Sequence, residues 1–217
     1  MSPKELLDQM SYESSVEREE AQKYIALKGM LQYQRVVNYC KTGEDKPAYK
    51  IVSDLYKYDK RLRDKLYIYL ATVEEFLRAC IGNKYEDNES CLIKTPIFAK
   101  KQTQYHSVSF TLEQLTLKEL NDMVLTNISI FQNLYDLNVL EINIDALRVL
   151  RNRVGHHNFL LAESYAACSV DGKVDNTLKH NIINVKCLLP SEFRQGFVNS
   201  INNCTKNLLI DKHMILI

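Results

Sequence analysis

The pattern that most constrains the fold is a long run of apolar residues spaced three and four positions apart between residues 48 and 81. Its members include Leu55, Tyr58, Leu62, Leu66, Tyr69, Val73, Phe76, Leu77 and Cys80. This spacing gathers apolar side chains on one face of an α-helix. Glycine (6) and proline (4) are scarce in the 217 residues, so few positions interrupt helices. The sequence therefore predicts a mainly α-helical chain, and Gly82-Asn83 is expected to end this helix.

Capping signals predict further helices on both sides of the long one. Ser2-Pro3 resembles a helix start, and Ser15 is suited to cap a helix that Gly29 interrupts. Thr116 and Glu119 have the spacing of a capping box. We expect these additional helices over residues 3–10, 15–40, 116–133, 142–157 and 191–208.

Two segments depart from the helical pattern. Residues 83–110 are polar and irregular, which predicts a long connection with at most one short helix and no assigned role. Residues 165–170 and 182–188 are rich in strand-forming residues, and Asp171-Gly172 between them is a turn signal. A small β-hairpin is therefore expected near residues 165–188.

Length and composition fit one soluble domain. Hydrophobic residues make up 46% of the chain and charged residues 25%, which is ordinary for a globular protein with a core. We expect a single domain over 1–217: an N-terminal helical extension over about 1–47, core helices over 48–160, and a hairpin with a C-terminal helix over 161–217. With no apolar run of roughly 18 residues and no signal-peptide core, the expected location is the cytoplasm, away from membranes.

Charge and cysteine spacing narrow the function classes. The formal net charge is +1, whereas a dedicated non-specific DNA-binding domain is clearly basic, so a nucleic-acid site here must be a local patch. The 6 cysteines include no C-x-x-C pair and no zinc-ligand spacing to a histidine pair, which favours free thiols in a reducing compartment. We expect no metal and no cofactor.

The segment that carries chemistry is residues 143–158. At about 100° per residue, one arc of about 140° on the predicted helix collects the polar residues and a glycine. These are Arg148, Arg151, Asn152, Gly155 and His156. The opposite, core-facing side carries Leu147, Leu150 and Val154.

These residue types suit metal-independent cleavage of RNA. His156 can move a proton near neutral pH, and Arg151 can hold the extra negative charge of the transition state. Asn152 can orient the imidazole or donate to a phosphate oxygen. A glycine inside a helix costs about 1 kcal/mol relative to alanine, and Gly155 would let a partner helix approach closely. We therefore expect a homodimer with a shared site.

The same residues carry a family resemblance. Residues 151–156 (RNRVGH) resemble the R-x(4–6)-H motif of HEPN domains. Residues 33–39 (YQRVVNY), 55–63 (LYKYDKRLR) and 151–160 are similar, in this order, to three motifs of the Abi family of abortive-infection proteins, the AbiD/AbiF-like group. The resemblance implies a HEPN-type helical bundle, a dimer, and an endoribonuclease in phage defence or a toxin-like system. Arg151, Asn152 and His156 are then the catalytic residues.

Other interpretations of these residues remain open. Arg151 could pair with a carboxylate on a neighbouring helix, and His156 could cap the helix C-terminus. Arg148, Arg153 and His157 are candidate RNA contacts, but solvated charges and a packed imidazole are the simpler alternatives. At the level of the whole chain, the alternative is a catalytically silent HEPN module that dimerises and binds a partner protein, a nucleotide or RNA. An antitoxin would be one such partner, and a regulatory nucleic-acid-binding protein is a third, weaker alternative.

Two further groups are expected to be structural. Asp59 and Arg63 lie four residues apart on the long helix, where a salt bridge is common. The tyrosines at 56, 58, 67 and 69 follow the helical pattern, which favours core packing over stacking on nucleic-acid bases. Glu74-Glu75 has no second cluster at ligand spacing, so it does not indicate a metal site.

Overall fold

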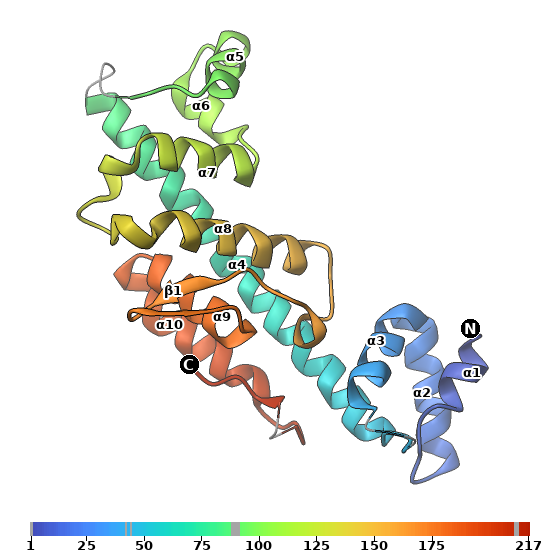
Figure 1. Cartoon of the computed structure of the whole chain (residues 1–217). Coiled ribbons are helices and arrows are strands. Elements are labelled where there is room, and N and C mark those ends of the chain that lie inside the picture. The colour runs from blue at the N-terminus through green and yellow to red at the C-terminus, as the bar shows by residue number, and fades with distance from the viewer. Residues whose placement is uncertain (1, 42, 44, 88–91, 211–212) are drawn as a thin grey trace. The chain divides into compact units, whose positions relative to one another are not determined.

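The computed structural model (Figure 1) is mainly helical with one small two-stranded antiparallel sheet, as the sequence predicts. It describes residues 2–41, 43, 45–87, 92–210 and 213–217. These form two compact units. The first unit comprises Met1–Leu66, Arg153–Glu163 and Asn199–Ile217, and the second comprises Tyr67–Asn152 and Ser164–Val198. The expected single domain, with its three sections, stays a prediction.

The first unit begins with three short helices that pack against one another. They are α1 (Pro3–Leu7), α2 (Ser15–Lys28) and α3 (Met30–Cys40). The predicted start of α1 is confirmed, because Ser2 and Glu5 form a reciprocal capping box. Gly29 separates α2 from α3 with a φ of +93°, a backbone conformation that glycine adopts without steric cost. The α2 cap is one residue earlier than expected, since the Ser14 side chain accepts from the backbone of Glu17.

The long helix α4 (Tyr49–Asp87) belongs to the first unit up to Leu66 and to the second from Tyr67. Its predicted apolar face is buried, with Leu55, Tyr58 and Leu62 each at 0% exposure. The predicted core packing of Tyr67 is wrong, because this residue is 61% exposed.

The expected end of this helix at Gly82 is also wrong. A Cβ added to Gly82 would lie 3.6 Å from a methyl carbon of Leu112, on α6 (Val108–Glu113). The glycine thus faces a packed neighbour five residues before the end of the helix. Packing of this kind offsets the loss of about 1 kcal/mol that glycine causes relative to alanine, so the helix continues.

Segment 83–110 contains more regular structure than expected. Residues 83–87 extend α4, while α5 (Pro96–Tyr105) and the start of α6 occupy the later part. Side chains of Thr95 and Ser107 cap these two helices. These capping residues are hard to recognise in a segment that is polar throughout. Residues 88–91 lie outside the described part of the chain. In Figure 1, α5 and α6 lie side by side within the second unit.

The predicted capping box at Thr116 and Glu119 is confirmed at the start of α7 (Leu117–Thr126). This helix ends earlier than residue 133, and the short 3-10 helix η2 (Ile128–Phe131) follows it. Helix α8 (Leu137–Gly155) then carries the residues with candidate chemistry. Amide side chains connect it to its surroundings in the second unit, since Asn143 exchanges two hydrogen bonds with the backbone of Ser169 (2.7 and 2.9 Å).

The predicted hairpin is real but shorter than expected. Strand β1 (Cys168–Val170) pairs antiparallel with β2 (Lys173–Asp175), and the turn residues Asp171 and Gly172 have φ values of +50° and +74°. The expected second strand at 182–188 is wrong, because those residues belong to α9 (Leu178–Leu188), which Thr177 caps. The last long helix, α10 (Ser191–Asn202), stops before the expected residue 208 and is followed by η4 (Asn203–Thr205).

Two remaining expectations concern the chain as a whole. Within the described residues, no helix has both the length and the hydropathy needed to cross a membrane. The five cysteines in the described part of the chain are free thiols, and Cys168 and Cys204 are buried. Burial raises the pKa of Cys204 to about 11, so this thiol is protonated near neutral pH. Cys91 lies outside the described residues.

Candidate functional site

Helix α8 has the two faces that its sequence predicts. The side chains of Leu147, Leu150 and Val154 are 0–2% exposed. Arg151 and His156 are exposed. The helix therefore anchors itself through its apolar stripe and presents its polar residues to solvent.

The motif itself is divided between the two units. Arg151 and Asn152 belong to the second unit, whereas Arg153 to His157 belong to the first.

In the second unit, Arg151 forms an ion pair with a glutamate of α4. Its Nε donates to Oε1 of Glu74 at 3.0 Å, and the two side chains are 45% and 12% exposed. Glu74 also lies 3.6 Å from a terminal nitrogen of Arg78. Arg151 therefore pairs with a carboxylate on another helix, which is one of the alternatives that the sequence left open. Because the contact uses Nε, it orients the guanidinium without consuming the two terminal amino groups.

The neighbouring arginines are also ion-paired. Arg148 donates two hydrogen bonds to one oxygen of Asp145, at 2.9 and 2.7 Å. Arg153, in the first unit, lies 3.1 Å from Glu163. Both cations therefore have local partners, and an RNA phosphate would have to compete with these carboxylates for them.

In the first unit, α8 ends in a Schellman motif built on the two histidines. The backbone N–H of His157 donates to Val154, and that of Asn158 donates to Arg153, both at 3.1 Å. This closure places His157 in the left-handed region at a φ of +54°, where glycine is more usual. His156 directly follows the last helical residue and is exposed.

His157 is held by an arginine that sequence reasoning did not connect to it. Nη1 of Arg63 lies 3.4 Å from Nδ1 of His157, and Gln32 donates to the His157 carbonyl at 3.1 Å. A guanidinium only donates, so Nδ1 acts as the acceptor in this contact.

Arg63 is itself fixed by a buried carboxylate. Its Nε donates to Asp59 at 2.8 Å, and the two side chains are 9% and 1% exposed. The other Asp59 oxygen accepts from the backbone N–H of Leu160 at 2.6 Å. Burial raises the Asp59 pKa to about 6, against the lowering effects of Arg63 and of the backbone donors. The predicted structural pair is thus confirmed, and it connects α4 with the chain that follows α8.

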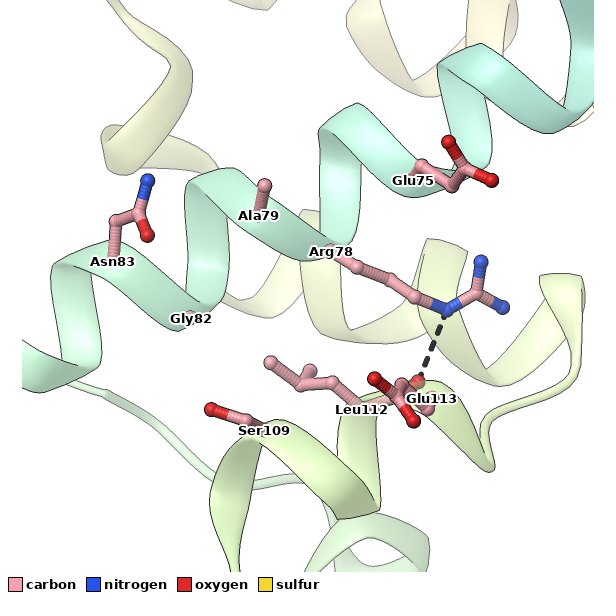
Figure 2. A pocket seen from close by; sticks show the side chains of 8 residues that line it. All are labelled: Glu75, Arg78, Ala79, Gly82, Asn83, Ser109, Leu112 and Glu113. Carbon is pink, nitrogen blue, oxygen red and sulfur yellow. Dashed lines mark hydrogen bonds between the residues drawn. The ribbon is translucent and has the colours of Figure 1, made fainter.

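A separate pocket lies in the second unit, between α4 and α6 (Figure 2). Glu75, Arg78 and Glu113 are among the residues that line its volume of about 270 Å³. Arg78 donates to the backbone carbonyls of Leu112 and Leu115, at 3.0 and 2.9 Å, so its guanidinium is engaged in holding the chain. Within the residues that the structure describes, no group of three or more histidine, cysteine, aspartate or glutamate side chains is suited to a metal ion. This pocket brings none of the predicted site residues together.

Comparison with protein-family models, with curated proteins and with solved structures finds no match to this chain. A functional interpretation therefore depends on the residues described above.

Proposed function

We propose that the chain is a HEPN-type endoribonuclease that cleaves single-stranded or looped RNA without a metal ion. The observation that supports this most directly is the exposure of Arg151 and His156 at the polar end of α8, whose opposite face is buried. An exposed guanidinium can stabilise the charge of the transition state, and an exposed imidazole five residues away can serve one of the two proton transfers of RNA transesterification. Unstacked RNA is favoured because its 2′-oxygen must rotate into line with the leaving oxygen.

The chemistry follows from these groups. The RNA 2′-oxygen loses its proton and forms a bond to phosphorus, while the bond from phosphorus to the 5′-oxygen breaks and that oxygen gains a proton. His156 serves as the base or the acid for one of these transfers. Terminal nitrogens of Arg151 hold the non-bridging oxygens as their charge grows, and Asn152 orients the imidazole or the phosphate. The products carry a 2′,3′-cyclic phosphate and a 5′-hydroxyl.

A second copy of the chain would complete the site. One chain supplies one arginine and one histidine, whereas the reaction needs both a base and an acid. A symmetric homodimer that meets near Gly155 would bring two of each to one cleft. In such a dimer Glu74 is a positioning residue, because it holds the Nε edge of Arg151. The cellular setting that we infer is phage defence by abortive infection or a toxin-like system, with an antitoxin or another protein as a partner.

The direct test is cleavage of an unstructured RNA in the presence of EDTA. We expect the wild-type chain to cleave it and to leave 2′,3′-cyclic phosphate ends, and the Arg151→Ala and His156→Ala variants to lose activity by roughly 100-fold or more. Arg18→Ala is a matched control, because Arg18 is an exposed, ion-paired arginine on α2. His106→Asn controls for loss of an exposed histidine and suits its left-handed φ of +59°. Cleavage that survives both site variants would eliminate the proposed site.

The dimer is tested separately by light scattering on the same samples. A mass about twice that of one chain is expected for wild type and for both site variants. A monomer that cleaves RNA at full rate would remove the shared site while leaving Arg151 and His156 in place.

The Arg151–Glu74 ion pair favours one rival function. If this arginine serves only to join α8 to α4, the chain is a silent binding module of the same fold. Wild-type protein would then bind RNA or a partner without cleaving RNA, and the effect of Arg151→Ala would be a loss of stability.

A further inference from the structure

A pocket in the first unit has the composition of a nucleotide site, and its lining includes none of the proposed catalytic residues. Its volume is about 220 Å³, and α2, α3 and α4 all contribute to its lining. Tyr24, Tyr33 and Tyr56 supply aromatic rings, and Lys28, Lys57, Lys60 and Arg61 supply cations. We call this the tyrosine–lysine pocket.

The rings are organised for stacking. Tyr33 and Tyr56 stack with 4.9 Å between centroids and 8° between planes. Tyr33 is 2% exposed, whereas Tyr56 is half-buried, so a buried ring fixes the plane of a partly accessible one. A pre-oriented ring loses little conformational freedom when a base stacks on it, and such stacking is tolerant of base identity.

The charges favour an anion. Lys57 lies 3.2 Å from Asp54, and Lys60 lies 2.7 Å from Asp64. These two carboxylates partly neutralise the charges of the two lysines. Arg61 instead donates to the backbone carbonyls of Cys204 and Lys206, at 3.3 and 2.8 Å. Neutral carbonyls fix this guanidinium without cancelling its charge. The lining contains no carboxylate among the residues that the structure describes. Phosphate is the anion that such a cluster beside an aromatic ring suits best.

The size of the pocket favours one nucleotide of a longer nucleic-acid strand over a free small molecule as the ligand. Sites that enclose a whole small ligand measure about 300–1,000 Å³. This pocket is smaller, at about 220 Å³. A single base with its phosphate, presented by a strand that continues over the surface, needs no complete enclosure.

We propose that the tyrosine–lysine pocket binds one nucleotide of a single-stranded nucleic acid, with a base on Tyr56 and a phosphate among Lys57, Lys60 and Arg61. That the strand is RNA rests on the proposed function, whereas binding itself does not. The pocket would bind the substrate at a place other than the bond that is cleaved. Stacking and charge would give affinity there without base-specific hydrogen bonds. The chain needs such a local patch because its formal net charge is only +1.

The test is binding of the full chain to a labelled 2′-O-methyl oligouridine of roughly ten nucleotides, followed by fluorescence anisotropy. This RNA has no free 2′-hydroxyl and cannot be cleaved by the proposed chemistry, so failure of binding and failure of catalysis are separate results. We expect Tyr56→Ala to weaken binding roughly 5- to 150-fold and Tyr56→Phe to retain it. Lys60→Ala and Lys57→Ala should each lower the salt dependence by about 0.7 in the slope of log affinity against log salt.

Controls make the outcome decisive. Lys50→Ala removes an exposed lysine of the same helix that does not line the pocket, and it should bind like wild type. Thermal melting shows whether Tyr56→Ala still folds. If it does not, the two lysine variants still test the pocket, because both lysines are exposed.

Unchanged affinity and salt slope in the Lys57, Lys60 and Tyr56 variants would overturn the proposal. Displacement of the strand by an equal concentration of AMP would overturn the choice of a strand over a free nucleotide. Equal binding of the matching DNA would remove only the preference for RNA.

Discussion

Two arginine–carboxylate pairs of the molecule differ in how far they are buried. Arg63 and Asp59, in the first unit, are 9% and 1% exposed, whereas Arg151 and Glu74, in the second unit, are 45% and 12% exposed. The buried pair uses its remaining polar atoms internally, on Leu160 and His157. The half-exposed arginine is oriented through one nitrogen only. A buried arginine thus organises the chain around it, and a half-exposed one stays available to a ligand.

The largest expected effect comes from breaking the buried pair. Asp59→Ala removes the carboxylate that binds the buried Arg63 guanidinium, which should lower the free energy of unfolding by about 3–5 kcal/mol. Urea denaturation followed by circular dichroism measures this loss. The matched control is Asp64→Ala, because Asp64 pairs with Lys60 on the surface of the same helix. That change should cost less than about 0.5 kcal/mol. Equal losses for the two variants would contradict the contrast between buried and exposed pairs.

The next effect concerns pH. Burial raises the pKa of Asp59 to about 6, above its ordinary value near 4, so the folded chain binds a proton that the unfolded chain does not hold between these values. The resulting stability is fully present below about pH 4 and is lost as pH rises through 6, by roughly 3 kcal/mol. The stability of wild type relative to Asp59→Asn should therefore fall between pH 4 and pH 7. Carboxyl-carbon NMR of Asp59 reports the midpoint directly, and a midpoint at or below 4 would refute the prediction.

A smaller effect on stability than at the buried pair is expected at the half-exposed pair. Arg151→Ala and Glu74→Gln should each change the free energy of unfolding by less than about 1 kcal/mol, because solvent screens a pair that is partly exposed. Cleavage should respond differently: Arg151→Ala should abolish it, and Glu74→Gln should lower kcat with little change in KM, since the guanidinium is then less well oriented. A stability loss at Arg151 as large as that at Asp59 would show that both pairs are structural.

Much of the helical architecture could be predicted because its signals are local. The Thr116–Glu119 capping box, the break at Gly29 and the Asp171-Gly172 turn each depend on a few adjacent residues. Errors arose where tertiary contacts decide the outcome. Gly82 stays helical because Leu112 packs beside it, and residues 182–188, which resemble a strand, complete a helix whose cap lies at Thr177.

At the candidate site, the part that could be predicted is the orientation of one helix. Helical geometry predicts which face of α8 is buried, and the exposures of Leu150 and Arg151 agree with it. Partners from other segments could not be predicted. Glu74 lies 77 positions before Arg151, and Arg63 lies 94 positions before His157, distances in sequence that no helical period spans. The same limit hid the tyrosine–lysine pocket, since Tyr56 was expected in the core.

The two hydrogen bonds from Arg61 have a consequence for how pocket occupancy can be sensed. The guanidinium that would meet a phosphate also secures the carbonyls of Cys204 and Lys206, in the turn after α10. Both hydrogen bonds come from Nη1, so the other guanidinium nitrogens can meet an anion while this turn keeps its bonds. Filling the pocket would therefore hold the turn more firmly, and the exchange of its amide hydrogens with solvent deuterium would slow down there. The turn would then act as an internal reporter of an occupied site.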